Sequence, residues 1–175
     1  PAGLVYAAVG NLRAIDPPPA PRQAHALAGG QIGAMVDRLA MRLREAPNDA
    51  EGWTMLARSL AALGRYEESA KAFARLAELT PGNAGVLADY ADTLAMARGR
   101  KLDGPPFALV KRALAIDPKH LKSLALAGSA EFERGNFQSA IRYWERILAL
   151  VPAESGFAGS VQASIAQARQ KLSGS

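Results

Sequence analysis

Acidic side chains at helical spacing are the first residues in this sequence that could do chemistry. Asp89 and Asp92 share one predicted helix, and Glu67 and Glu68 share another. Paired carboxylates are groups that general acid–base catalysis uses. Carboxylates on a helix surface are usually solvated. We therefore expect both pairs to be surface groups.

The other candidate chemical groups are two histidines. His25 lies in a proline-rich stretch and His120 at a predicted helix start, and neither has a sequence neighbour to act with. The chain has no cysteine, which excludes thiol nucleophiles, thiolate metal sites and disulfides. No GxGxxG, Walker A or HExxH motif occurs. We expect a protein that is not an enzyme and that holds no cofactor and no metal.

The composition favours helices. Hydrophobic residues make up 49% of the 175 residues, aromatic residues only 6%, and the apolar set is dominated by Ala and Leu. Ala and Leu lose little side-chain freedom on entering a helix. The net charge of +5 is a mild excess that falls short of a nucleic-acid signature.

Four prolines close similar phrases at a nearly constant spacing. The phrases are LREAPND with Pro47, AELTPGN with Pro81, LAIDPKH with Pro118 and LALVPAE with Pro152. Successive prolines lie 34, 37 and 34 residues apart. Each unit between them has two apolar stripes of helical period, split by a Gly-containing turn. Each unit ends near its proline, because proline cannot donate to the helix ladder and biases its predecessor away from helix.

The interior of these units resembles the tetratricopeptide repeat (TPR) family, whose repeat is 34 residues long. GRYEESAKAFARLAELTP and GNFQSAIRYWERILALVP align over 18 residues without a gap. Ala57 and Gly128 are small where two helices would cross closely. We predict an all-α TPR helical-hairpin solenoid of three repeats. The large residues expected in its core are Trp53, Tyr66, Phe73, Tyr90 and Trp144.

The ends of the chain differ from the repeats. Residues 31–46 have one apolar face and are predicted to form an N-terminal half-repeat helix. Residues 155–172 start at a potential N-cap and are predicted to form a C-terminal capping helix. The TPR domain is therefore placed at residues 31–172, after a proline-rich N-terminal arm at residues 1–30. The apolar start PAGLVYAAVG is too short to span a bilayer. It is either the end of a membrane helix or a floppy arm.

The middle repeat contains the extra residues. Its turn, at residues 98–106, is longer than the others and carries Arg98, Arg100 and Lys101. Two interpretations stay open, a solvated loop or a loop that contacts a partner.

A TPR stack curves, and the first helix of each repeat lines its concave side. Positions i, i+4 and i+8 on those helices, with one aromatic neighbour, are the predicted peptide-binding residues. They are Thr54, Arg58, Ala62, Ala88, Asp92, Met96, Ala125, Ser129, Phe132 and Glu133. The alanines leave room, so an amphipathic helix could lay its apolar face there.

A narrower resemblance covers roughly residues 31–172. The half-repeat helix before PNDAEGW, the inserted GRKLDG and the string YWERIL look like the assembly subunit of bacterial cytochrome c maturation, the CcmI/CycH family. The resemblance implies a periplasmic TPR chaperone, anchored in the inner membrane. It would bind the C-terminal helix of apocytochrome c and present it to the haem-ligation complex.

Three other functions remain as alternatives. One is a non-catalytic scaffold in a multiprotein complex, and another is the related TPR helper of haem nitrite reductase assembly. The third is a cytosolic adaptor for acidic C-terminal tails. Such an adaptor needs several groove cations, and only Arg58 and Lys122 lie near the predicted groove.

Overall fold

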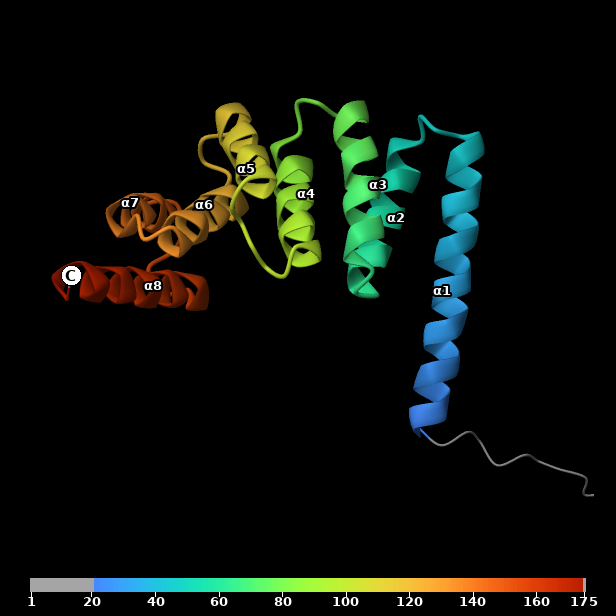
Figure 1. The fold of residues 1–175 in the computed structure, drawn as a ribbon, viewed down its shortest axis with the longest axis horizontal. Coiled ribbons are helices and arrows are strands. Elements are labelled where there is room, and N and C mark those ends of the chain that lie inside the picture. Colours follow the sequence, from blue (N-terminus) through green and yellow to red (C-terminus); the bar gives the residue numbers. More distant parts are fainter. Residues whose placement is uncertain (1–20, 175) are drawn as a thin grey trace, which may run out of the picture. The chain divides into compact units, whose positions relative to one another are not determined.

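The structure is a computed structural model that describes the backbone of residues 21–174 and the side chains of residues 30–174. Every regular element in those residues is an α-helix, which confirms the predicted class (Figure 1). The helices are α1 (Pro21–Glu45), α2 (Ala50–Ala62), α3 (Tyr66–Leu79), α4 (Ala84–Ala97), α5 (Pro105–Ile116), α6 (Leu121–Glu133), α7 (Phe137–Leu148) and α8 (Gly156–Ser173). The predicted membrane-helix end at residues 1–10 lies outside the described residues.

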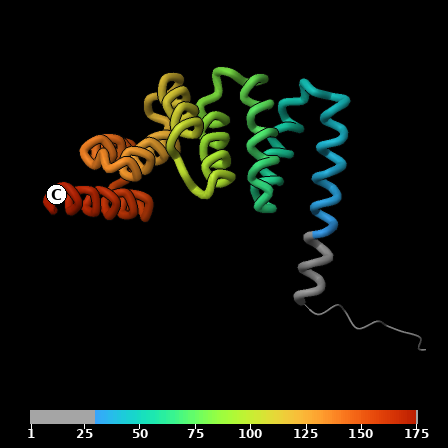
Figure 2. Tube along the Cα trace, viewed as in Figure 1, coloured from blue at the N-terminus to red at the C-terminus, as the bar shows by residue number. Residues whose placement is uncertain are grey.

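Two compact units divide the chain, residues 1–38 and residues 39–175, and α1 extends across the boundary. Within residues 39–175 each helix from α2 onward packs against the next one (Figure 2). The pairs α2–α3, α4–α5 and α6–α7 are the three predicted repeats, and α8 follows the last of them. No helix within residues 21–174 is long and apolar enough to cross a membrane.

A side-chain cap starts the first helix of each of the three repeats and also starts α8, in each case just after a closing proline. The capping atom accepts a hydrogen bond from a backbone N–H that would otherwise lack a partner. The donors and acceptors are Gly52 N to Asp49 Oδ1 (2.8 Å), Val86 N to Asn83 Oδ1 (3.1 Å), Ser123 N to His120 Nδ1 (3.3 Å) and Ala158 N to Ser155 Oγ (3.1 Å). The phrase around each proline therefore both ends one helix and begins the next.

The turn inside each repeat has one design. Gly64, Gly99 and Gly135 have positive φ, which glycine adopts without steric cost. The next residue donates its N–H to a carbonyl five residues back, as in a Schellman motif: Arg65 to Leu60 (2.9 Å), Arg100 to Ala95 (2.8 Å) and Asn136 to Glu131 (2.8 Å). Arg100 differs from its counterparts because its own φ is +67°. The chain leaves the turn there as the inserted loop.

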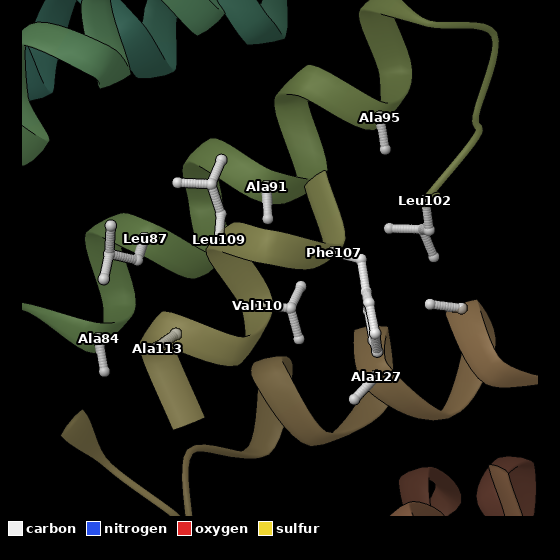
Figure 3. Close-up of a cluster of buried hydrophobic side chains, with 11 residues drawn as sticks. Ala84, Leu87, Ala91, Ala95, Leu102, Phe107, Leu109, Val110, Ala113 and Ala127 are labelled. Atoms are coloured by element: carbon white, nitrogen blue, oxygen red, sulfur yellow. The ribbon is translucent and has the colours of Figure 1, made fainter. Parts of the chain in front are cut away.

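The inserted loop is anchored in a core. Leu102 is only 6% exposed and belongs to the cluster formed by α4, α5 and α6, near Phe107 (Figure 3). Its N–H donates to Glu133 Oε2 at 3.3 Å. The loop therefore packs against the core, and it covers residues 98–104 and not the predicted 98–106, because α5 begins at Pro105. Arg98, Arg100 and Lys101 project from it exposed.

A second core lies between α6, α7 and α8. Gly128 lies against the indole ring of Trp144. The contact is so close that a Cβ added to Gly128 would lie only 2.6 Å from Cε2 of Trp144. This confirms that Gly128 marks a close helix crossing. Val161, Ile165 and Ala168 of α8 are buried, as predicted for a capping helix. Phe157, in the first turn of α8, is 44% exposed.

Helix α1 is longer than predicted. It begins at Pro21, ten residues before the predicted start at residue 31. Proline is tolerated in the first turn of a helix, where its missing N–H is not needed. Leu43 near its end is fully buried, and Gly52 of α2 gives it room. Ile32 and Met35, expected on the apolar face, are 49% and 64% exposed.

Candidate functional site: the charged face of α2, α4 and α6

An ion-pair chain joins the first helices of all three repeats. Lys122 of α6 places its Nζ 2.8 Å from Asp89 Oδ1 and 2.8 Å from Asp92 Oδ2, both on α4. Arg58 of α2 places its Nη2 3.9 Å from the other oxygen of Asp89. We call these four residues the charged face. Its formal charges cancel, because two cations meet two carboxylates.

Lys122 is the centre of this chain. Burial disfavours its charged form, but the hydrogen bonds and charges of Asp89 and Asp92 outweigh burial and raise the pKa of Lys122 above its ordinary value of 10.5. The ammonium group therefore stays charged at neutral pH and holds the two carboxylates of α4 together.

Arg58 is held much less tightly than Lys122. Its side chain is 70% exposed, against 41% for Lys122, 30% for Asp89 and 44% for Asp92. A separation of 3.9 Å is an ion pair without a hydrogen bond. Arg58 is thus the most accessible charge of the four.

The structure places most of the predicted peptide-binding residues at the surface of α2, α4 and α6. Arg58 and Asp92 lie on the charged face. Exposed or half-buried side chains are found at Ala62, Met96, Ala125, Ser129 and Glu133. Thr54 is half-buried, and its hydroxyl donates to the carbonyl of Ala50 at 2.8 Å. Peptide contact by these residues stays a prediction.

The prediction for Ala88 is wrong. Ala88 has no exposed surface, so it cannot contact a ligand in this conformation. Its neighbour Asp89 occupies the surface instead. Each helical residue turns by about 100°, so a choice one residue early moves the side chain from the surface into the core. The signal was available, since a carboxylate beside an alanine is the better surface candidate.

Phe132 and Glu133 have structural partners of their own. The ring of Phe132 lies 5.2 Å from the ring of Phe137 and 5.9 Å from that of Trp144. Phe132 therefore packs mainly within its own repeat, on α7. Glu133 binds the inserted loop through Leu102 N–H. These contacts leave part of each side chain available at the surface.

Lys122 was missed as a site residue, although it was noted as a nearby cation. Its partners are 33 and 30 residues away along the chain. Periodicity identifies which residues share a helix face, but it does not identify which residues of different repeats form pairs.

Cavities elsewhere are shallow and lie between successive helices. One of about 340 Å³ is mostly apolar and lies between α3 and α4, lined by Ala70, Ala74, Tyr90 and Leu94. Another of about 440 Å³ lies between α7 and α8, where Arg169 pairs with Glu145 at 3.1 Å. Among the described residues, no group of three His, Asp or Glu side chains could hold a metal ion.

Antiparallel helix pairs at 34-residue spacing, with capped first helices and glycine turns, define a TPR protein. Two crystal structures of MamA share this fold with a TM-score of 0.63 and 14% identity, and the first covers 86% of this chain and 84% of its own. The family model described as "Cytochrome c-type biogenesis protein H TPR domain" matches residues 29–157. The chain belongs to that family, which confirms the resemblance found in the sequence.

Named relatives agree with this assignment. CycH of Pseudomonas aeruginosa is 33% identical over 138 residues, which cover 79% of this chain and 34% of the relative. CcmH of Escherichia coli K12 is 30% identical over 164 residues, covering 92% of this chain and 45% of the relative. The formate-dependent nitrite reductase complex subunit NrfG of Escherichia coli O157:H7 is 26% identical over 117 residues, which cover 67% of this chain and 59% of the relative. The chain thus spans less than half the length of the cytochrome c biogenesis relatives. Both CycH and CcmH are named as cytochrome c-type biogenesis proteins.

Proposed function

We propose that this domain is a periplasmic TPR chaperone of a membrane-anchored protein, and that it binds the C-terminal helix of apocytochrome c. It would deliver this substrate to the haem-ligation complex and would itself catalyse nothing. The observation that supports the proposal most is the charged face, which joins α2, α4 and α6 of a cytochrome c biogenesis TPR domain. A helix lying across these three helices would contact every repeat at once.

The residues around the charged face suit a helical ligand. Ala62 and Ala125 are small, and Met96 has a flexible, polarisable side chain that adapts to different apolar partners. An amphipathic helix could bury its apolar face against these residues and keep its polar face in water.

The charged face does not suit a free terminal carboxylate. An adaptor for acidic tails needs unpaired cations that converge on one carboxylate group. Lys122 already binds both Asp89 and Asp92. Of the two cations of the charged face, only Arg58 is then accessible to a ligand carboxylate, which disfavours the adaptor alternative.

Fluorescence anisotropy tests the proposal. A labelled peptide from the C-terminal helix of an apocytochrome c is titrated with this domain, and an internal helix of the same cytochrome is the control. Arg58→Glu is the test variant. Arg112→Glu is the matched control variant, because it makes the same change at an exposed residue of α5, the second helix of the middle repeat. We expect saturable binding of the C-terminal peptide only, weakened by Arg58→Glu and unaffected by Arg112→Glu. A domain that binds neither peptide would refute the chaperone function.

A second candidate is a helper of haem nitrite reductase assembly. The similarity to NrfG favours it, although NrfG is less identical to this chain than CycH of Pseudomonas aeruginosa and CcmH of Escherichia coli K12 are. A C-terminal peptide of the haem nitrite reductase, in the same titration, distinguishes the two. Tighter binding of that peptide than of the cytochrome c peptide would favour the second candidate.

A further inference from the structure

The charged face presents its charges in an uneven way. The ion pairs run from Arg58 to Asp89, from Asp89 to Lys122 and from Lys122 to Asp92, so both carboxylates lie on α4 and the two cations lie on α2 and α6. Asp89 is the least exposed of the four side chains and Arg58 the most exposed. The Arg58 guanidinium is therefore the charge of this face that is most accessible to an approaching helix.

Arg58 can leave its present partner at little cost. Asp89 keeps its 2.8 Å contact with Lys122 when Arg58 moves away, so no carboxylate is left without a cation. Exposed ion pairs are weak, because water solvates both groups and the side chain loses freedom in forming the pair. The guanidinium is thus available to a new anion.

The surroundings of Arg58 strengthen a new pair. Ala62, one turn along α2, is exposed and apolar. A bound amphipathic helix would exclude water from this neighbourhood, and an ion pair gains strength as the local dielectric constant falls. Arginine can also hold a carboxylate with two parallel hydrogen bonds, which fixes its orientation.

The opposite charge is less favoured in the ligand. A ligand cation would have to compete with Lys122 for Asp89 and Asp92, which Lys122 holds at 2.8 Å each. The positive charge of Arg58 would also repel it. The charged face therefore discriminates between an acidic and a basic residue on the ligand.

We propose that the helix bound by this face carries an acidic residue at the border of its apolar side, and that Arg58 recognises this residue. The proposal rests on the proposed function, because it specifies the ligand of the same face. It defines the ligand class as an amphipathic helix with one carboxylate bordering its apolar stripe.

A reciprocal charge swap tests this proposal. The peptide is a C-terminal apocytochrome c helix with a glutamate next to its apolar stripe, used as such and with that glutamate changed to Gln or Lys. A second peptide with Glu changed to Lys on the fully polar side is the control. The proteins are the wild-type domain, Arg58→Glu and Arg112→Glu, each checked by circular dichroism for helix content and melting temperature.

We expect the Gln peptide to bind the wild type about fivefold more weakly, the size of a favourable exposed ion pair. The Lys peptide should bind more weakly still, and Arg58→Glu should restore it while weakening the unchanged peptide. Arg112→Glu should behave as wild type. Equal binding of all peptides, or no rescue by Arg58→Glu, would overturn the recognition by Arg58 and leave the chaperone function standing. Failure of every peptide to bind would overturn both.

Discussion

Gly128→Ala should destabilise the domain through one contact. The α carbon of Gly128 faces the indole of Trp144 so closely that an added Cβ would lie 2.5 Å from its Cδ1 and 2.6 Å from its Cε2. Trp144 is 6% exposed and packed in the core of α6, α7 and α8, so its rigid ring has little space to move. Overpacking of this kind costs about 1–3 kcal/mol, and we expect a value near the upper end.

Alanine also brings a gain, because it favours the helix interior by about 1 kcal/mol over glycine. The net loss in the free energy of unfolding should therefore be about 2 kcal/mol. This corresponds to a melting temperature lower by roughly 5–10 °C for a domain of this size. Urea unfolding followed by circular dichroism measures the first quantity, and a thermal melt measures the second.

Gly159→Ala is the matched control. Gly159 lies in α8, and a Cβ built there meets nothing within 4 Å. The same substitution should therefore raise the free energy of unfolding, by up to about 1 kcal/mol. Adding Gly128→Ala to a Trp144→Leu background should cost much less than adding it to the wild type, because the clashing ring is gone. A Gly128→Ala domain as stable as the wild type would show that the crossing of α6 and α7 is looser than described.

Three further substitutions test the inserted loop and the charged face. Arg100→Gly should raise the free energy of unfolding by up to about 1 kcal/mol in urea titrations, because the φ of +67° is unfavourable for an L-residue. Leu102→Ala should lower it by about 2–4 kcal/mol and speed amide hydrogen exchange across residues 98–104, because it empties a core position. Lys122→Gln tests the raised pKa of Lys122. A raised folded-state pKa gives stability that is fully present below about pH 10.5 and is lost as the pH rises through the folded-state pKa. The wild type should therefore lose more stability than Lys122→Gln as the pH rises above about 10.5, and parallel curves would contradict this role.

The repeat architecture could be predicted because its signals are local. The proline, the capping residue and the turn glycine of each repeat act within a few residues, and each meets a requirement of the backbone. Asp49 and Gly64 show this, since one accepts the N–H of Gly52 and the other supplies a positive φ. The start of α5 is local in the same way, since two prolines occupy its first turn, where a missing N–H is not needed.

The anchored loop could not be predicted, because its contacts cross the chain. Leu102 binds Glu133, which is 31 residues away, and fills a core that three helices build together. The sequence shows only a polar insertion that contains one leucine. Its order depends on where that leucine points in the folded chain.

The charged face could be predicted only in part for the same reason. Helical periodicity identified Arg58 and Asp92, because each lies on the solvent side of its own helix. It selected Ala88 in place of Asp89, because an error of one residue turns a helical position by about 100°, enough to move it from the surface into the core. The link through Lys122 depends on how α6 packs beside α4, which no single helix specifies.

The central claim is that α2, α4 and α6 together bind a helix from apocytochrome c. Two-dimensional ¹H–¹⁵N NMR of the labelled domain, titrated with the C-terminal apocytochrome c peptide, tests it most directly. We expect shifts concentrated on these three helices, with Arg58, Asp92 and Ser129 among the residues most affected and α8 unchanged. Shifts confined to α7 and α8, or spectra that do not change at saturating peptide, would contradict it.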